Sequence, residues 1–213
     1  MSIRSDIRTH HLEENVFLLE NFLDLPQQEE LAGVISSMGD LENGFYRPVC
    51  RYGPMSIEMM CFGMHWNPQT YQYETHRSDH DNLPAHPLLP LFHRWAKDAC
   101  RWIGDDIVPG VCIANRYGPK SKMGLHRDKD ESPETIKNGI PVVSISLGNS
   151  CIFQLGGLKR KDPKRDLTLQ SGDVLLWGGS DRLRYHGVKK ILPQTSPLVT
   201  LPDHRINLTI RQL

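Results

Sequence analysis

The chain has 213 residues, with 25 lysines and arginines against 25 aspartates and glutamates. That length suits one domain with a sizeable core, and the balanced charge leaves only local clusters as candidates for binding a polyanion. The five cysteines are odd in number and form no CxxC pair, which argues against a disulfide framework or a zinc knuckle. No run of 18 apolar residues occurs, and Met1–Asp6 lack the apolar region of a secretory signal, so a soluble cytoplasmic protein is expected.

Two amphipathic helices are predicted in the first half of the chain. Asp24 is a candidate N-cap, with a proline two residues later and Gln27 placed to complete a capping box before an apolar run at helical spacing. A second helix is predicted from about Pro87 to Ile103. Its apolar stripe recurs every three or four residues, at Leu88, Leu91, Trp95, Ala99 and Trp102.

Between these helices, residues 43–86 are rich in aromatic residues, methionine, glycine and proline and show little sustained periodicity. A long irregular stretch within a compact domain is usually either disordered or a functional lid. The aromatic content of this stretch favours a lid.

From residue 111 onward, short β-type runs alternate with turn residues. Short strands joined by glycine-rich connections are typical of an antiparallel sandwich or barrel. We therefore expect a mixed α+β, mainly β fold. Its core is a double-stranded β-helix (jelly roll) over about residues 111–213, to which the N-terminal helices are added. Residues 1–213 are expected to form a single domain. The predicted strands are Val111–Tyr117, Val142–Leu147, Cys151–Leu155, Leu167–Leu169, Val174–Trp177, Leu183–His186 and Ile206–Ile210.

The most informative motif is His126-Arg127-Asp128, with His186 further along the chain. On an extended segment, residues two apart project to one face, so His126 and Asp128 could bind one ion. We take His186 as the third ligand because it lies on a late predicted strand, whereas the other histidines lie in polar surroundings or beside prolines. Two imidazoles and a carboxylate suit one face of an octahedral Fe(II) ion. A lone HxD pair is common by chance, and a single histidine is often only a surface or core residue.

An Fe(II) site with open positions could take a bidentate 2-oxo acid and dioxygen, and the far carboxylate of that acid would need a buried cation. Arginine binds carboxylates bidentately. Arg205 and Arg211 are an even number of residues apart, so on one strand they share a face with Asn207. Asn115 and Tyr117 could add hydrogen bonds from the opposite wall. The alternative for Arg211 is a solvated chain end.

Several segments together resemble the AlkB family of Fe(II)/2-oxoglutarate dioxygenases, most closely its bacterial branch that repairs alkylated DNA. The resemblance covers roughly residues 45–213 and is far more specific than HxD…H alone. The segments that carry it are Asn115–Tyr117, Leu125–Glu131, Val143–Gly148, Ile152–Arg160, Gly172–Gly179, Tyr185–Gly187 and Arg205–Arg211.

By this resemblance, Fe(II), 2-oxoglutarate and dioxygen are the expected cofactor and co-substrates. Three residues would bind iron and carry the catalysis: His126, Asp128 and His186. Five would bind 2-oxoglutarate: Arg205, Asn207 and Tyr117 at its distal carboxylate, and Asn115 and Arg211 near its oxo-acid end.

For the substrate, the resemblance matches Trp66 and Tyr73 to the aromatic pair of the family's nucleotide-recognition lid, and Asp130 to the acidic residue that meets the exocyclic amine of the base. A methylated base must leave the stack to reach the iron site, where aromatic faces could hold it. A cationic base would gain further from a nearby carboxylate. Ordinary packing is the alternative for the aromatic pair. Lys159–Arg165 is the densest basic stretch, and Arg160 within it is our candidate phosphate contact, although such runs are usually solvated loops.

The implied function is oxidative demethylation of N-alkylated nucleobases in DNA, such as N1-methyladenine and N3-methylcytosine, with release of formaldehyde, succinate and CO2; this is direct-reversal DNA repair. The expected partner is alkylated DNA, preferably single-stranded, or RNA. The protein is expected to be a monomer and not to associate with a membrane. The alternatives are the same chemistry on RNA or protein, a non-catalytic binder of alkylated nucleic acid, and a cupin-like enzyme of small metabolites that would not need residues 43–86. The presence of all three candidate ligands and both arginines counts against the binder.

Overall fold

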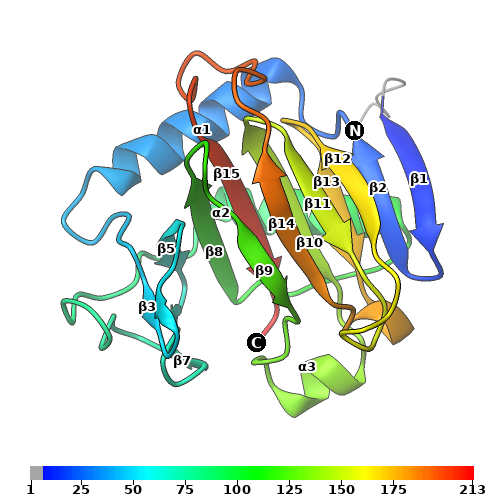
Figure 1. The fold of residues 1–213 in the computed structure, drawn as a ribbon, viewed down its shortest axis with the longest axis horizontal. Coiled ribbons are helices and arrows are strands. Elements are labelled where there is room, and N and C mark those ends of the chain that lie inside the picture. The colour runs from blue at the N-terminus through cyan, green and yellow to red at the C-terminus, as the bar shows by residue number, and fades with distance from the viewer. Residues whose placement is uncertain (1–6) are drawn as a thin grey trace.

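Residues 7–213 are described by the computed structural model, and within them two antiparallel β-sheets face each other (Figure 1). Met1–Asp6 lie outside the described residues, so the prediction that they form no secretory signal is not tested by the structure. The larger sheet has seven strands in the spatial order β1 (Arg8–Glu13), β2 (Val16–Glu20), β13 (Val174–Trp177), β10 (Val142–Gly148), β15 (Arg205–Arg211), β8 (Val111–Tyr117) and β5 (Glu58–Phe62). The smaller sheet has four, in the order β12 (Arg165–Leu169), β11 (Cys151–Leu155), β14 (His186–Ile191) and β9 (Met123–His126).

This pair of sheets confirms the predicted jelly-roll class, and most predicted strands are confirmed within one or two residues of their ends. The prediction for Leu183–His186 was wrong, because the strand begins only at His186. Before it, a short 3-10 helix (Gly179–Asp181) leads into a turn in which the Arg184 N–H donates to the Asp181 carbonyl at 3.0 Å. The first two strands, β1 and β2, were not predicted at all.

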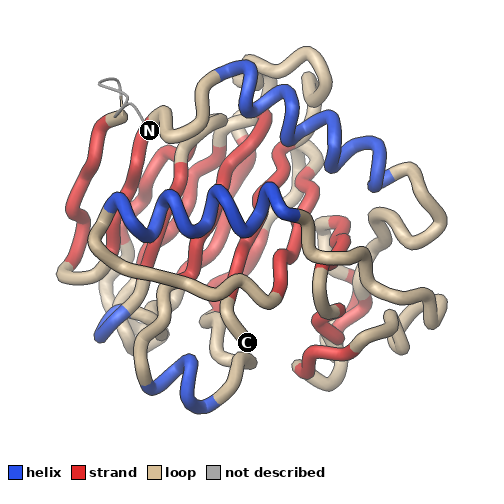
Figure 2. Tube along the Cα trace, turned by 180° about the vertical axis from the view of Figure 1, so that it is seen from behind, coloured by secondary structure: helices blue, strands red, loops and turns tan. Residues whose placement is uncertain are grey.

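Both predicted helices form. Helix α1 (Leu25–Gly39) has the expected capping box, in which Asp24 accepts from the Gln27 N–H and the Gln27 side chain accepts from the Asp24 N–H, each at 2.9 Å. Helix α2 (Pro90–Trp102) begins three residues later than predicted, at a proline that suits the first turn. It lies across the outer face of the large sheet, with α1 beside it (Figure 2). No helix among the described residues is long and apolar enough to span a membrane.

Alternation along the strands divides the core into two layers. In β13, Val174 and Leu176 pack in the layer beneath the helices, whereas Leu175 and Trp177 pack in the layer between the two sheets. Successive side chains of a strand point to opposite faces, so the large sheet supplies both layers. The candidate site lies in the layer between the sheets.

The segment 43–86 is more ordered than the sequence predicted. Residues 58–62 form β5, which pairs with β8 at the edge of the large sheet, so this part of the segment belongs to the core. The run Glu58-Met59-Met60-Cys61-Phe62 lacks alternation because four of its five residues are buried. The remainder forms two small hairpins beyond that edge (Figure 1): β3 (Val49–Cys50) with β4 (Gly53–Pro54), and β6 (His65–Asn67) with β7 (Gln72–Glu74).

Candidate active site

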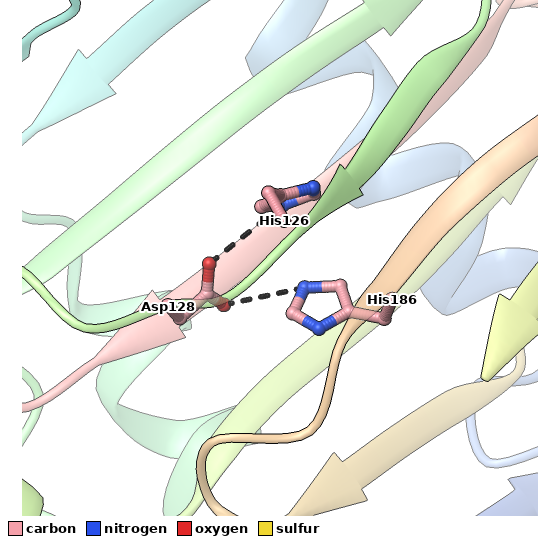
Figure 3. Close-up of side chains that lie close together, drawn as sticks. All are labelled: His126, Asp128 and His186. Carbon is pink, nitrogen blue, oxygen red and sulfur yellow. Dashed lines mark ion pairs between the residues drawn. The ribbon is translucent and has the colours of Figure 1, made fainter. Parts of the chain in front are cut away.

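Three potential metal ligands converge between the sheets. His126 ends β9 and pairs directly with His186 at the start of β14, while Asp128 follows two residues after His126. The Nε2 atoms of the two histidines lie 3.8 and 3.7 Å from the two carboxylate oxygens of Asp128 (Figure 3). One ligand atom from each residue fits within 4.8 Å of the others. This spacing allows all three side chains to bind one ion.

Hydrogen bonds fix which nitrogen of each histidine is free. Nδ1 of His126 lies 2.9 Å from the Gly124 carbonyl, and Nδ1 of His186 lies 3.0 Å from the Arg184 carbonyl. A carbonyl can only accept, so each Nδ1 carries the proton and each Nε2 keeps a lone pair for a metal. One buried oxygen of Asp128, Oδ2, has no hydrogen-bond partner among the described residues. Two imidazoles and one carboxylate with this geometry fit Fe(II) and leave other positions of the ion open.

The protonation of the cluster also suits a metal. Burial alone would raise the pKa of Asp128, but the Arg211 guanidinium 2.8 Å away, together with the neighbouring histidines, holds that pKa well below its usual range. Burial and the proximity of His126 lower the pKa of His186 to about 4. At neutral pH the cluster therefore presents a carboxylate and a neutral buried imidazole, the forms that bind cations.

A cavity beside the three ligands brings together every residue that we assigned to 2-oxoglutarate. The pairing of β15 with β8 explains this, because Arg205 lies opposite Tyr117, and Asn207 opposite Asn115, so that all four share one face. Arg211 lies on the same face of β15 and also lines the cavity. The lining includes Asn115, Tyr117, His126, Asp128, His186, Arg205, Asn207 and Arg211.

The two arginines of this cavity are buried and keep donors available. Arg205 is 1% exposed, and its NH2 group donates to Ser146 at 2.9 Å. The Nε atoms of Arg205 and Arg211 have no partner among the residues that the structure describes. The alternative of a solvated end for Arg211 is wrong, since this residue is 8% exposed and paired with Asp128. A buried guanidinium with a free donor suits an anionic ligand such as a carboxylate.

The candidate substrate residues lie together at the rim of the site. Trp66 and Tyr73 are directly opposite each other in the β6–β7 hairpin. The Trp66 indole N–H donates to Asp130 at 3.0 Å, and the Tyr73 hydroxyl donates to Glu131 at 2.8 Å. Burial raises the pKa of Asp130. The hairpin is therefore joined to the loop that supplies Asp128.

The basic stretch Lys159–Arg165 contacts the end of β9, next to the candidate metal ligand His126. Arg160 is exposed, and its guanidinium donates to the Leu125 carbonyl at 2.8 Å, one residue before His126. The remaining cations of this stretch, Lys159, Lys161, Lys164 and Arg165, are also exposed. Arg160 is thus close to the metal ligands while its neighbours face solvent.

Sequence reasoning missed a buried ion pair beneath the site. Arg182, 2% exposed, donates to the Asp128 carbonyl at 2.6 Å and to the Glu131 carboxylate at 2.9 Å. It thereby fixes the backbone of the metal-binding loop. The pair is separated by about fifty positions, and nothing in the local sequence marks either residue as buried. We also grouped His65 and His86 with histidines in polar or proline-flanked surroundings, yet both are buried.

Residues 15–211 match the model of the 2OG-Fe(II) oxygenase superfamily, and the chain belongs to this family. The family resemblance stated from the sequence is thereby confirmed. The chain is 41% identical to the alpha-ketoglutarate-dependent dioxygenase AlkB of Escherichia coli (strain K12), over 74% of this chain and 72% of that protein. It is 37% identical to the DNA N(6)-methyladenine demethylase ALKBH1C of Arabidopsis thaliana over 92% of its own length.

That second match covers 48% of the Arabidopsis protein, so the chain spans about half the length of this relative. A solved structure, that of OsALKBH1, superimposes with a TM-score of 0.91 at 32% sequence identity. The superposition covers 97% of this chain and 100% of the other. The fold and the His-Asp-His cluster therefore belong to a family that uses Fe(II), 2-oxoglutarate and dioxygen.

Proposed function

We propose that the protein is an Fe(II)- and 2-oxoglutarate-dependent dioxygenase that removes N-methyl groups from alkylated bases in DNA. The observation that carries this proposal is the His126, Asp128 and His186 cluster, set between a buried arginine cavity and an aromatic hairpin. When bound, the iron with 2-oxoglutarate and dioxygen supplies oxidation of the methyl C–H bond, coupled to loss of CO2 and formation of succinate. The hydroxymethyl group left on the base nitrogen then leaves as formaldehyde, which restores the base.

The protein's own contribution on the iron side is to orient ligands and to exclude water. The backbone carbonyls that accept from the two Nδ1–H groups hold both rings with Nε2 toward the ion. Arg205 would bind the distal carboxylate of 2-oxoglutarate, with Tyr117 and Asn207 adding neutral hydrogen bonds. Asn115 and Arg211 would meet the oxo-acid end.

On the substrate side, Trp66 and Tyr73 would hold the flipped base, with the ring of His126 as the opposing face. Asp130 would accept from the exocyclic amine. A carboxylate beside an aromatic face favours a cationic base, so N1-methyladenine and N3-methylcytosine are the lesions that we propose. The Arabidopsis relative is named for N6-methyladenine, which makes that uncharged lesion the second candidate.

We further propose that the strand is held by its phosphates along exposed cations. Arg160 and its loop lie on one side of the site, and a surface groove lined by Arg47 and Lys120 lies where the 118–121 turn meets Ser56. A single strand needs no unpairing before the base can turn out, so we propose a preference for single-stranded DNA, with RNA as the alternative.

We also propose that residues 1–213 act as one dioxygenase domain, with the hairpins of 43–86 as the lid and 111–213 as the jelly-roll core. A monomer in the cytoplasm is our proposal for its state and compartment. All five cysteines are free, which is consistent with a reducing environment.

The test is formaldehyde release from oligonucleotides that carry one defined lesion. Protein, Fe(II) and 2-oxoglutarate are combined without oxygen, and air is then admitted with N1-methyladenine or N6-methyladenine in single-stranded DNA, duplex DNA or RNA. We expect the fastest turnover with N1-methyladenine in single-stranded DNA. Faster turnover of RNA or of N6-methyladenine would show that the preferred substrate differs from the one proposed. An absence of formaldehyde with every substrate would overturn the proposed activity.

A further inference from the structure

The β6–β7 hairpin has two faces with different environments. Trp66 and Tyr73 face Asp130 and Glu131 at the candidate site. Strand residues alternate in direction, so His65 and Asn67, on either side of Trp66, project away from it. Both are buried, and His65 is fully so. The hairpin is therefore held from behind by a polar interior that takes no part in the chemistry proposed above.

The centre of that interior is the carboxylate of Asp79, whose side chain is only 1% exposed. Its Oδ1 lies 2.5 Å from Nε2 of His65, and its Oδ2 accepts from the Tyr46 hydroxyl at 3.0 Å. Hydrogen bonds to a charged group are the strong ones, and a buried charge is tolerated only when it is paired. Asp79 thus joins the base of the hairpin to Tyr46.

Tyr46 is in turn fixed to the large sheet. Its N–H and carbonyl exchange hydrogen bonds with Met59 of β5 at 3.1 and 2.8 Å. Arg77 donates to the Gly44 carbonyl at 2.7 Å, and its guanidinium lies 5.1 Å from the centre of the Tyr46 ring. The hydroxyl of Tyr46 is therefore a rigid point, and the chain of contacts runs from the sheet through Tyr46 and Asp79 to His65.

The hairpin needs such a support. Its strands have three residues each, and an isolated two-stranded hairpin is at best marginally stable in water. None of Tyr46, His65 and Asp79 lines the cavity beside the metal ligands, and all three side chains are buried behind the hairpin. These residues consequently have no direct route to the reacting atoms, and any effect on the reaction must pass through the placement of Trp66 and Tyr73.

We propose that Tyr46, His65 and Asp79 form a positioning cluster that fixes the Trp66–Tyr73 hairpin over the cavity and so sets the affinity for the extruded base. This inference rests on the proposed function where it names the base as the ligand. A purely structural role would change the unfolding midpoint but leave the affinity of the folded protein for its substrate unchanged.

The test compares His65→Asn with His93→Asn, a matched change on α2, on the outer face of the large sheet. For His65→Asn we expect the KM for a methylated oligonucleotide to rise about tenfold, the scale of a hydrogen bond to a charged group, with kcat and the KM for 2-oxoglutarate changed less than about twofold. His93→Asn should leave all three unchanged. In the double variant His65→Asn/Asp79→Asn, the KM for the oligonucleotide should rise by less than the product of the two single-variant increases. Both single changes remove the same interaction, so their effects should not add.

A second readout does not depend on catalysis. In the absence of any substrate, amide hydrogen exchange in residues 65–74 should be faster in His65→Asn than in the parent protein, with the exchange in β8 and β15 unchanged. If the parent releases no formaldehyde, the proposed function fails while this exchange experiment still decides the positioning role.

Should His65→Asn not fold, Tyr46→Phe replaces it, since that change removes one hydroxyl and keeps the ring over Arg77. An unchanged KM together with unchanged exchange in residues 65–74 would overturn the positioning role. A proportional loss of kcat at constant KM would overturn it as well, because that pattern places the defect in the chemical step.

Discussion

The iron side of the site rests on long strands of two sheets, whereas the substrate side rests on a hairpin of two three-residue strands. His186, Arg205 and Asn207 each occupy a paired strand position whose direction follows from register. Trp66 and Tyr73 depend instead on side-chain hydrogen bonds, from Trp66 to Asp130 and between Tyr73 and both Glu131 and Arg211, and on the cluster behind them. The iron side is thus fixed mainly by backbone pairing, except for Asp128, whose loop is held by the Arg182 side chain, and the substrate side is fixed by a few polar side chains.

This difference suggests a division of roles. Most residues that we propose to hold iron and 2-oxoglutarate lie on paired strands, and these residues cannot shift without disturbing a sheet. The hairpin can change its side chains and supports while the sheets remain intact, because function sits at sites carried by a fold rather than in the fold itself. Substrate choice should therefore respond to mutations that leave iron and 2-oxoglutarate binding unchanged.

The largest expected effect is on the iron side, from His126→Ala. Loss of one of three ligands should reduce formaldehyde release by at least about 1,000-fold, since a bound metal contributes several kcal/mol to the transition state. The His126 side chain is 41% exposed, so the unfolding midpoint should stay close to that of the parent. His11→Ala, at an exposed position on β1, is the control. Iron-dependent turnover that persists in His126→Ala would break the assignment.

The next effect is specific to the co-substrate. Arg205→Met keeps most of the buried volume but removes the guanidinium, and the KM for 2-oxoglutarate should rise roughly 10- to 100-fold, the scale of a charge-assisted hydrogen bond. Steady-state kinetics at saturating oligonucleotide measure this change. The KM for the oligonucleotide should not change, and neither KM should change in Arg101→Met on α2, where the arginine side chain is 68% exposed. An unchanged 2-oxoglutarate KM would show that the acid binds elsewhere.

For the hairpin, we expect the KM for the oligonucleotide to change and the KM for 2-oxoglutarate to stay the same. Trp66→Ala should raise the KM for the methylated strand about tenfold, because stacking of a base on an aromatic side chain contributes roughly 1–3 kcal/mol. The KM for 2-oxoglutarate should stay constant, which would sharpen the contrast between the two sides. Trp66→Phe retains an aromatic face and should fall between the parent and Trp66→Ala. Equal effects of Trp66→Ala on both constants would mean that the two sides are not independent.

The polar support of the hairpin predicts a pH dependence of stability. Burial lowers the pKa of His65, but Asp79 and Cys61 outweigh it and raise that pKa from 6.5 to about 9. A group whose pKa is raised on folding contributes stability that is fully present below its unfolded pKa and is lost as the pH rises through its folded pKa. Between about pH 6.5 and 9, the parent should lose on the order of 3 kcal/mol of unfolding free energy that His65→Asn does not lose.

Urea denaturation of the parent and of His65→Asn across this range measures the difference. The groups that face His65 are Asp79, Tyr46 and Cys61, so Asp79→Asn should remove most of the same pH dependence. Parallel pH profiles for the parent and for His65→Asn would contradict the charged pair.

The smallest expected effect is on DNA binding by the basic loop, which belongs neither to the iron side nor to the hairpin. Arg160→Ala should weaken binding of a methylated strand only severalfold and should reduce the slope of log affinity against log salt by about one, as expected for the loss of one phosphate contact. Fluorescence anisotropy at several salt concentrations gives the slope, with Lys97→Ala on α2 as the control. A slope that does not change would remove Arg160 from the nucleic-acid surface.

The same contrast explains what could be predicted from the sequence. A period of two is a property of every strand, so the common face of Arg205, Asn207 and Arg211 followed directly from their spacing. Strands β8, β11 and β13 were predicted residue for residue because turn residues bound their apolar runs. Strand β5 was missed because it is buried along most of its length and shows no alternation.

The supports of the hairpin could not be predicted in this way. His65 meets Asp79 and Tyr46 only after the chain has turned several times, and no periodic pattern relates these positions. The contact between Arg182 and Glu131 likewise joins distant loops. Residue spacing and the resemblance to a family supplied the candidate ligand-binding residues, but the residues that hold these candidates in place had to come from the structure.

The most direct test of the central claim is a crystal structure with Mn(II), which resists oxidation, and 2-oxoglutarate. We expect one anomalous peak within bonding distance of Nε2 of His126, Nε2 of His186 and a carboxylate oxygen of Asp128, with the distal carboxylate of the acid on Arg205. An ion bound away from these three side chains, or 2-oxoglutarate bound without contact to Arg205, would contradict the proposed site.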